Sequence, residues 1–132
     1  MSHVWEINGL SLELDLDNYD NMKRYEEAFD LMQEEETQLP KDGRQSERML
    51  AYCQLYYRLY DRIFGEGTSE KIFSGVPVSI RGTEEVYESF LAFVKGQMVQ
   101  QIQEQQQRYQ KYMPNRKQRR TVSKTVRQAA KK

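Results

Sequence analysis

The chain has 132 residues, with 20 basic and 20 acidic side chains, so its formal net charge is zero. This length allows one small domain with a modest core. A single cysteine, Cys53, excludes a disulfide within one chain, and no apolar run reaches the roughly 18 residues that a membrane-spanning helix needs. The first residues also lack the apolar segment of a signal peptide. We therefore expect a protein of the cytoplasm that makes no use of a membrane.

Residues 4–16 predict a β-hairpin. Asn8 and Gly9 favour a two-residue turn, because both tolerate the positive φ angles of a type I′ turn. After the turn, leucine alternates with polar residues and gives the second strand one apolar face; the leucines are Leu10, Leu12, Leu14 and Leu16. Two strands alone are marginal in water, so this face must pack on helices or on another sheet, and the free strand edge favours self-association. We take Leu12 and Leu14 as candidate contacts with another protein.

A first helix is predicted from Asn18 or Asp20 to about Glu36. Asn and Asp both suit the residue that caps the start of a helix. The apolar side chains recur every three or four residues and form one face; they are Met22, Tyr25, Phe29 and Met32. Proline and glycine in the segment 39–43 then end the pattern.

A second helix is predicted from its capping residue Ser46 to Phe64, just before Gly65. It is the most apolar helix, so we expect it to be central, with Cys53 buried as a small hydrophobic side chain. Three tyrosines follow one another at one-turn spacing on it: Tyr52, Tyr56 and Tyr60. Core packing with the hydroxyl reaching water is one interpretation of these tyrosines. A protein interface is the other, because tyrosine is enriched in interfaces.

A single helical turn is predicted from Thr68, followed by an extended segment at residues 76–80. Thr83 is the expected cap of a third helix, which Pro114 is expected to end. Eight of the fourteen residues 97–110 are glutamine. The apolar stripe thins in this stretch, so we expect a solvated extension of the helix or a stripe that another subunit completes.

From Pro114 to the C-terminus there are eight basic residues and no acidic ones, which leaves 12 basic and 20 acidic groups, a net charge of −8, in residues 1–113. We expect this basic arm to meet a polyanion or an acidic partner, or to fold back on the acidic body of its own or a neighbouring copy. Four of its residues are candidate contacts: Arg116, Lys117, Arg119 and Arg120. No aromatic residue follows Tyr112 to stack on bases, so nucleic-acid binding is the weaker expectation.

Together these elements predict an α+β fold, mostly helical, with an N-terminal β-hairpin, about three α-helices and a basic C-terminal arm. Residues 1–113 are expected to form one small domain and residues 114–132 the arm. One histidine and one cysteine far apart in the chain make neither a metal set nor a nucleophile pair. We therefore expect no catalytic residues, no cofactor and no metal, and an interaction protein in place of an enzyme.

Three stretches of the chain are distinctive in combination. They are WEINGL at residues 5–10, followed by an acidic helix with Tyr25 and Glu26, then YDRIFGEGTSEKIF at residues 60–73 and the basic close YMPNRKQRR at residues 112–120. In this combination the chain resembles the small tail assembly chaperones of tailed phages and prophages of Gram-positive bacteria. The resemblance covers most of the chain.

The resemblance implies a non-enzymatic protein that binds the tape measure protein, and in some cases the tail tube protein, in the cytoplasm of the bacterial host. Such chaperones keep a long, aggregation-prone helical chain soluble until the tube polymerises, and they are absent from the finished virion. No site residues transfer from the family, so the candidates remain those named above, together with self-association. Two rivals stay open: a structural or connector component of the phage particle, and a nucleic-acid-binding regulator that uses the basic arm.

Overall fold

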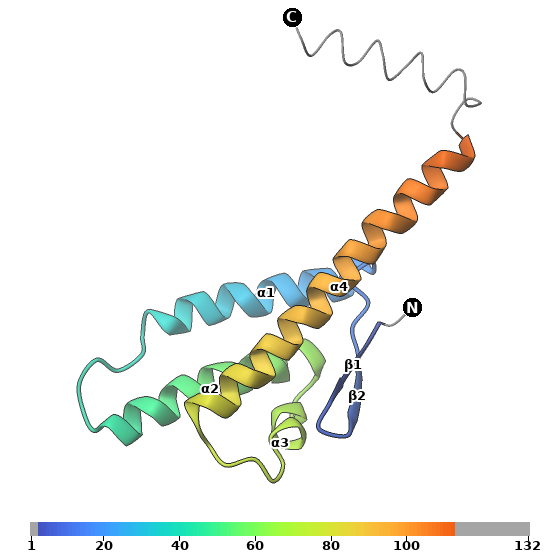
Figure 1. Ribbon diagram of the computed structural model, residues 1–132. Coiled ribbons are helices and arrows are strands. Elements are labelled where there is room, and N and C mark those ends of the chain that lie inside the picture. Colours follow the sequence, from blue (N-terminus) through green and yellow to red (C-terminus); the bar gives the residue numbers. More distant parts are fainter. Residues whose placement is uncertain (1–2, 113–132) are drawn as a thin grey trace, which may run out of the picture. The chain divides into compact units, whose positions relative to one another are not determined.

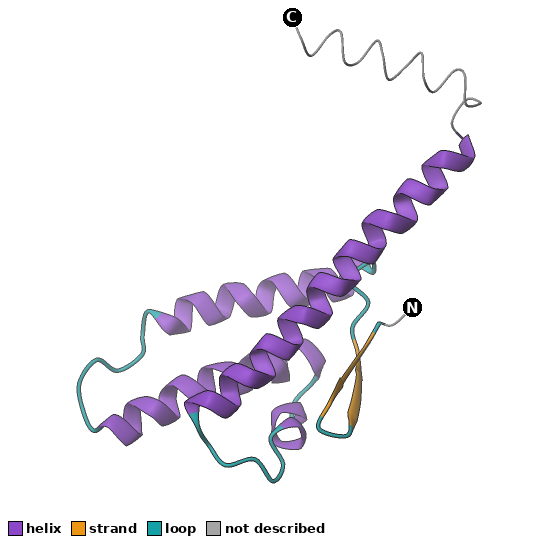
Figure 2. Cartoon of the chain, in the orientation of Figure 1, coloured by secondary structure: helices purple, strands orange, loops and turns teal. Residues whose placement is uncertain are grey.

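A computed structural model describes residues 3–112 of the chain. Its elements in order are β1 (Val4–Ile7), β2 (Leu10–Glu13), α1 (Tyr19–Glu36), α2 (Gln45–Phe64), α3 (Thr68–Ile72) and α4 (Ile80–Tyr112) (Figures 1 and 2). The predicted α+β, mostly helical fold with an N-terminal hairpin is confirmed, and α3 is the predicted helical turn. The chain divides into two compact units, and the boundary between Met98 and Val99 lies within α4.

The hairpin forms at the predicted turn. β1 and β2 pair antiparallel with Trp5 opposite Leu12, and Asn8 and Gly9 have φ angles of 48° and 77°. These positive angles give the turn the twist that matches the two strands. The side-chain amide of Asn8 also donates to the carbonyl oxygens of Ile72 (2.9 Å) and Ser74 (3.1 Å). The turn is therefore tied to the end of α3 as well as to its own strands.

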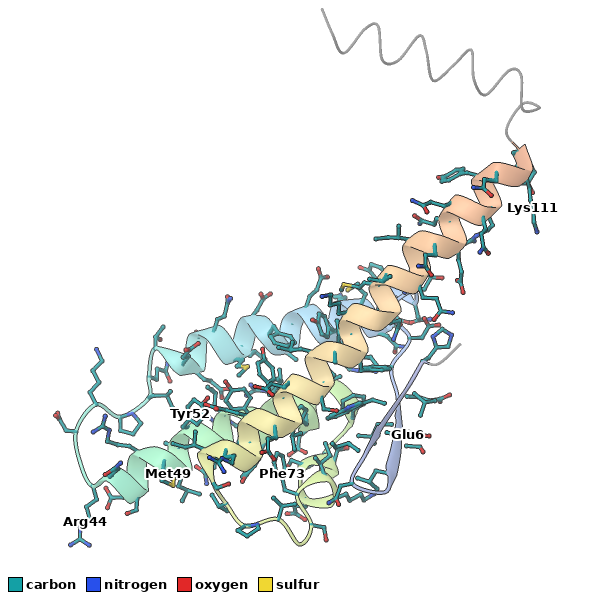
Figure 3. All side chains as sticks on the ribbon, viewed as in Figure 1. Glu6, Arg44, Met49, Tyr52, Phe73 and Lys111 are labelled. Atoms are coloured by element: carbon teal, nitrogen blue, oxygen red, sulfur yellow. The ribbon has the colours of Figure 1, made fainter. Side chains whose placement is uncertain are left out.

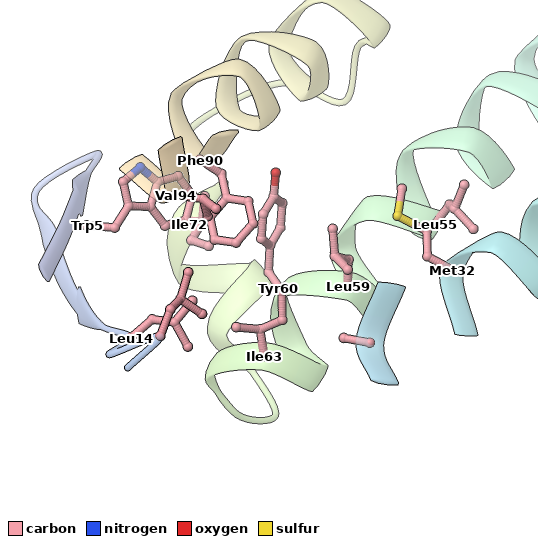
Figure 4. Close-up of a cluster of buried hydrophobic side chains, with 12 residues drawn as sticks. Trp5, Leu14, Met32, Leu55, Leu59, Tyr60, Ile63, Ile72, Phe90 and Val94 are labelled. Atoms are coloured by element: carbon pink, nitrogen blue, oxygen red, sulfur yellow. The ribbon is translucent and has the colours of Figure 1, made fainter. Parts of the chain in front are cut away.

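The core of the first unit is aromatic at its centre. Figure 4 shows Trp5 of the hairpin, Tyr60 of α2 and Phe90 of α4 next to one another. The ring centroid of Trp5 lies 5.2 Å from that of Phe90 and 5.7 Å from that of Tyr60. Such pairs add about 0.5–1.5 kcal/mol each beyond the area that they bury. The hairpin thus packs on the helices, as its leucine face requires, and Leu14 and Leu16 are enclosed there.

Two predicted helix caps are wrong and one is confirmed. Asn18 caps α1, since its side chain accepts from the Asn21 amide at 3.1 Å. α2 begins at Gln45, one residue before Ser46, and its capping residue Arg44 makes no side-chain cap bond. α4 begins at Ile80, three residues before Thr83. Sequence rules favour Ser and Thr as capping residues, but they do not identify which of several nearby candidates caps the helix.

Ser79 takes the place at the start of α4 that Thr83 was expected to fill. The Ser79 hydroxyl accepts from the Gly82 amide at 2.9 Å. Thr83 lies inside the helix and is buried, with its hydroxyl donating to the Ser79 carbonyl at 2.9 Å and 3.2 Å from the Cys53 sulfur. Cys53 is buried as predicted. Because α4 starts early, the segment 76–79 is a loop that leads directly into the helix.

Gln97 is the least expected part of the core. The sequence placed it in a solvated glutamine stretch, but only 2% of its surface is exposed. Its side-chain amide donates to the Leu14 carbonyl at 2.8 Å, and its side-chain oxygen accepts from the Leu16 amide. One glutamine therefore satisfies two buried backbone groups just beyond the end of β2, as a neighbouring strand would.

Candidate functional site

An open groove of about 380 Å³ lies beside the N-terminal part of α2. Its lining comes from three segments of the first unit: Leu39 and Pro40 after α1, four residues of α2 and the first residue of α4. The α2 and α4 residues are Gln45, Arg48, Met49, Tyr52 and Ile80. In Figure 3, Met49 and Tyr52 follow Arg44 along α2. The groove is therefore mainly apolar, with the polar side chains of Gln45 and Arg48 in its lining.

The helical repeat explains why these α2 residues share one wall. Residues three and four apart lie on the same face of a helix, and Gln45, Arg48, Met49 and Tyr52 have this spacing. Ile80 is the first residue of α4 and lines the groove from the opposite element. Its side chain is 40% exposed. Leu50, which lies between the lining residues Met49 and Tyr52 in sequence, is 43% exposed. The apolar surface at this end of α2 is thus available to solvent.

Tyr52 links the groove to a series of tyrosines along α2. Its hydroxyl shares a hydrogen bond of 3.3 Å with that of Tyr56, and it donates to the Glu84 carboxylate at 3.4 Å. The Tyr56 ring packs edge-on against Tyr52 (5.2 Å) and Tyr87 (4.9 Å). Burial, and next the hydrogen bond that Tyr56 donates to Tyr52, raises the pKa of Tyr56 above the usual tyrosine range. Tyr56 therefore stays uncharged at neutral pH, and Tyr52, Tyr56 and Tyr87 together form a tyrosine wall, an apolar surface with polar edges.

An ion cluster fixes α1 against α2 next to this wall. The Glu35 carboxylate accepts from Arg62 at 2.7 and 2.9 Å and from Arg58 at 3.0 Å. The hydrogen bonds from Arg62 hold the pKa of the Glu35 carboxyl below its usual value; both arginine charges act in the same direction, and partial burial opposes them. A smaller cavity of about 210 Å³ lies beside Glu35 and Arg58 and shares Leu39 and Pro40 with the groove.

The residues predicted as protein contacts separate into three groups. Tyr52 and Tyr56 are half-buried and touch one another at the groove. Leu14 and Tyr60 are fully enclosed in the core, and Leu12 is half-buried opposite Trp5. Leu14 and Tyr60 therefore cannot meet a partner while the unit is folded, because the hairpin packs its leucine face inward. The four basic residues of the arm lie outside the described residues: Arg116, Lys117, Arg119 and Arg120.

Sequence reasoning missed the other groove residues. Leu39 and Pro40 were taken only as part of a helix break and Ile80 as part of an extended segment, and Met49 was not singled out. An apolar residue next to a proline between two helices was the one local signal, because loop residues are usually polar. The groove itself depends on three segments meeting in space, which no local pattern encodes.

Residues 3–112 lack two features, a membrane-spanning helix and a cluster of metal ligands. No helix there is both long and apolar enough to cross a membrane. Within the same part of the chain, no three His, Cys, Asp or Glu side chains gather closely enough to hold a metal ion.

Comparison with known proteins gives one match. Residues 8–123, most of the chain, match a family described as "Family of unknown function (DUF6673)". No curated protein and no solved structure matches the chain.

Proposed function

The chain belongs to DUF6673, a family of unknown function, and we propose that it acts as a non-enzymatic assembly chaperone for a phage tail. It binds apolar helical segments of the tape measure protein, and of the tail tube protein in some systems, in the cytoplasm of the bacterial host. The groove beside α2 is the binding site. Besides the resemblance of its sequence, the observation that carries this proposal is an open apolar groove lined by Met49, Tyr52 and Ile80.

The groove has the chemistry of a site that takes a helix. An amphipathic helix lays side chains spaced by three and four residues into a groove, and such grooves are apolar with a few polar groups at the edge. Methionine adapts to differently shaped side chains because its chain is flexible and its sulfur is polarisable. Tyrosine adds a large contact area at low cost in conformational entropy. A surface of this kind suits a chaperone, which must accept many segments of one long partner.

The charge of the body supports the same role. Residues 1–113 have a net charge of −8, and α1 alone holds seven acidic and two basic residues. Complexes that carry this negative charge repel one another, and the repulsion keeps an aggregation-prone partner in solution. Binding in an open groove without a covalent bond is also reversible, so the partner can be released when the tail tube polymerises.

Co-expression tests the proposal directly. The tape measure protein of the same phage or prophage is expressed in bacteria with and without the chain, and its soluble fraction is measured after centrifugation. We expect the wild-type chain to raise this fraction several-fold and to co-purify with the tape measure protein. Ile80→Asp places a charge in the groove and should abolish both effects. The helix should tolerate this change, because an acidic residue in the first turn is favoured by the helix dipole.

Val78→Asp is the matched control. It adds the same charge two residues away, at a residue that does not line the groove, and it should leave both effects intact. Equal solubility with and without the chain would contradict the chaperone role, and full activity of Ile80→Asp would contradict the groove as the site. The rival role of connector makes a different prediction, since a connector remains in purified mature virions and a chaperone does not.

A further inference from the structure

The second half of α4 carries two neighbouring stripes that differ in character. In the first half of the helix, Phe90, Val94 and Gln97 recur at spacings of four and three and are buried. The same spacing continues with Gln101, Glu104, Arg108 and Lys111. All three charged residues of the segment 99–112 therefore lie on this first stripe, which suits solvent beyond residue 98.

The second stripe is displaced by one residue and stays neutral. It consists of Ile102, Gln105, Tyr109 and Tyr112, at spacings of three, four and three, and we call it the α4 seam. Ile102, Tyr109 and Tyr112 are 56%, 65% and 86% exposed, and Gln105 is exposed as well. A heptad spacing of this kind is typical of a helix that pairs with another helix.

We propose that the α4 seam pairs in parallel with the same seam of a second copy of this chain. The second half of α4, residues 99–112, buries none of its side chains, so that stretch of helix is marginal in water by itself and pairing stabilises it. In a parallel pair each seam residue meets its own counterpart, so Gln105 faces Gln105. A glutamine amide both donates and accepts, and two facing copies can therefore satisfy one another, as buried polar residues do when they set the register of a coiled coil.

The residues that flank the seam favour a second copy over a charged partner. In a parallel pair, Gln101 of one helix comes near Gln106 of the other, and these two can form hydrogen bonds; within residues 99–112, Arg108 is the one charged residue that flanks the seam. A strongly charged partner would lose hydration against the neutral seam and would gain no more than one opposite charge there, from Arg108. Continued toward the N-terminus, the spacing of the seam passes through Met98 and Lys95. Two Lys95 side chains would face and repel one another in a parallel pair, so the paired region begins after Lys95.

This inference goes beyond the proposed function, because the α4 seam contains none of the groove residues and its test uses the chain alone. Sedimentation velocity is measured on the full-length protein over a hundredfold range of concentration. We expect a reversible dimer, seen as a rise in sedimentation coefficient with concentration. Ile102→Glu places like charges opposite one another in the seam and should leave a monomer at every concentration. Circular dichroism of each variant confirms that the fold is retained, since Ile102 is exposed.

Gln103→Glu is the matched control, because it adds the same charge at the adjacent residue outside the seam and should dimerise as the wild type does. The orientation is tested by Gln105→Cys, which should oxidise to a disulfide-linked dimer, whereas Gln103→Cys should not. Cys53 is buried and does not compete. A wild-type protein that is monomeric throughout, or an Ile102→Glu variant that still dimerises, would overturn the pairing. Loss of the dimer in Ile102→Glu without cross-linking of Gln105→Cys would overturn the parallel arrangement.

Discussion

The two ends of α2 have the same helical structure and opposite surroundings. At the C-terminal end, Leu59 and Tyr60 have no exposed surface, and Trp5 of the hairpin and Phe90 of α4 pack on Tyr60. At the N-terminal end, Leu50 is 43% exposed and Tyr52 lines an open groove. The comparison teaches that one amphipathic helix can supply stability at one end and an accessible apolar surface at the other, depending on what lies across from it.

A matched pair of leucine substitutions should show this difference most strongly. Leu59→Ala empties a fully enclosed position and should lower the free energy of unfolding by about 2–5 kcal/mol. Leu50→Ala removes a half-exposed side chain and should lower it by less than about 1 kcal/mol. Urea denaturation followed by circular dichroism measures both values. Similar losses for the two variants would mean that the ends of α2 are packed alike.

A matched pair of tyrosine substitutions should give effects that differ in kind. The Tyr60 hydroxyl is buried and has no hydrogen-bond partner within the described part of the chain. Burial also raises the pKa of Tyr60 above the usual tyrosine range. Tyr60→Phe removes this unsatisfied group and should raise the free energy of unfolding by about 1 kcal/mol.

Tyr52→Phe should change the free energy of unfolding by no more than about 0.5 kcal/mol, because the Tyr52 hydroxyl is partly exposed and water can replace its bonds to Tyr56 and Glu84. The same denaturation experiment reports both tyrosine variants. A clear loss of stability in Tyr60→Phe would show that its hydroxyl has a partner in solution and would weaken the contrast between the two ends.

A further effect, no larger than that of Tyr60→Phe, concerns the ion cluster beside the groove. The pKa of Glu35 is lower in the folded chain than in the unfolded chain, so its contribution is complete above the unfolded value of about 4.3 and is lost as the pH falls through the folded value. Between pH 7 and pH 3, the wild type should therefore lose about 0.5–1 kcal/mol more stability than Glu35→Gln, a modest value because the carboxylate is partly exposed. If the free energies of unfolding of the two proteins fell equally between pH 7 and pH 3, the stabilising role of the Glu35 carboxylate would be contradicted.

The parts of the fold that the sequence predicts are those that depend on local patterns. Asn8 and Gly9 specify the hairpin turn, Asn18 caps α1, and a three- and four-residue repeat marks each long helix. Thr83 and Gln97 were misjudged because their roles are set by contacts with residues distant in sequence, namely Cys53 and Leu14. Another threonine and other glutamines of this chain are exposed to solvent. Only the packed structure distinguishes the buried ones from these.

The candidate site was predicted less well than the fold. Tyr52 and Tyr56 were correctly placed together on one face of α2, but Tyr60, on the same face by spacing, is enclosed by Trp5 and Phe90. Helical periodicity gives the direction of a side chain and says nothing about what covers it. Whether a tyrosine is core or surface is decided by the elements that pack across from it.

The bonds of Gln97 have a consequence for how the first unit opens. The amide hydrogen of Leu16 is held by a side chain 81 positions away in the sequence. Deuterium from the solvent can replace that hydrogen only when α4 withdraws from the hairpin or the whole unit unfolds. Leu16 therefore reports on the docking of α4, and a single slowly exchanging amide at the N-terminal end of the chain records whether a helix near its C-terminal end is in place.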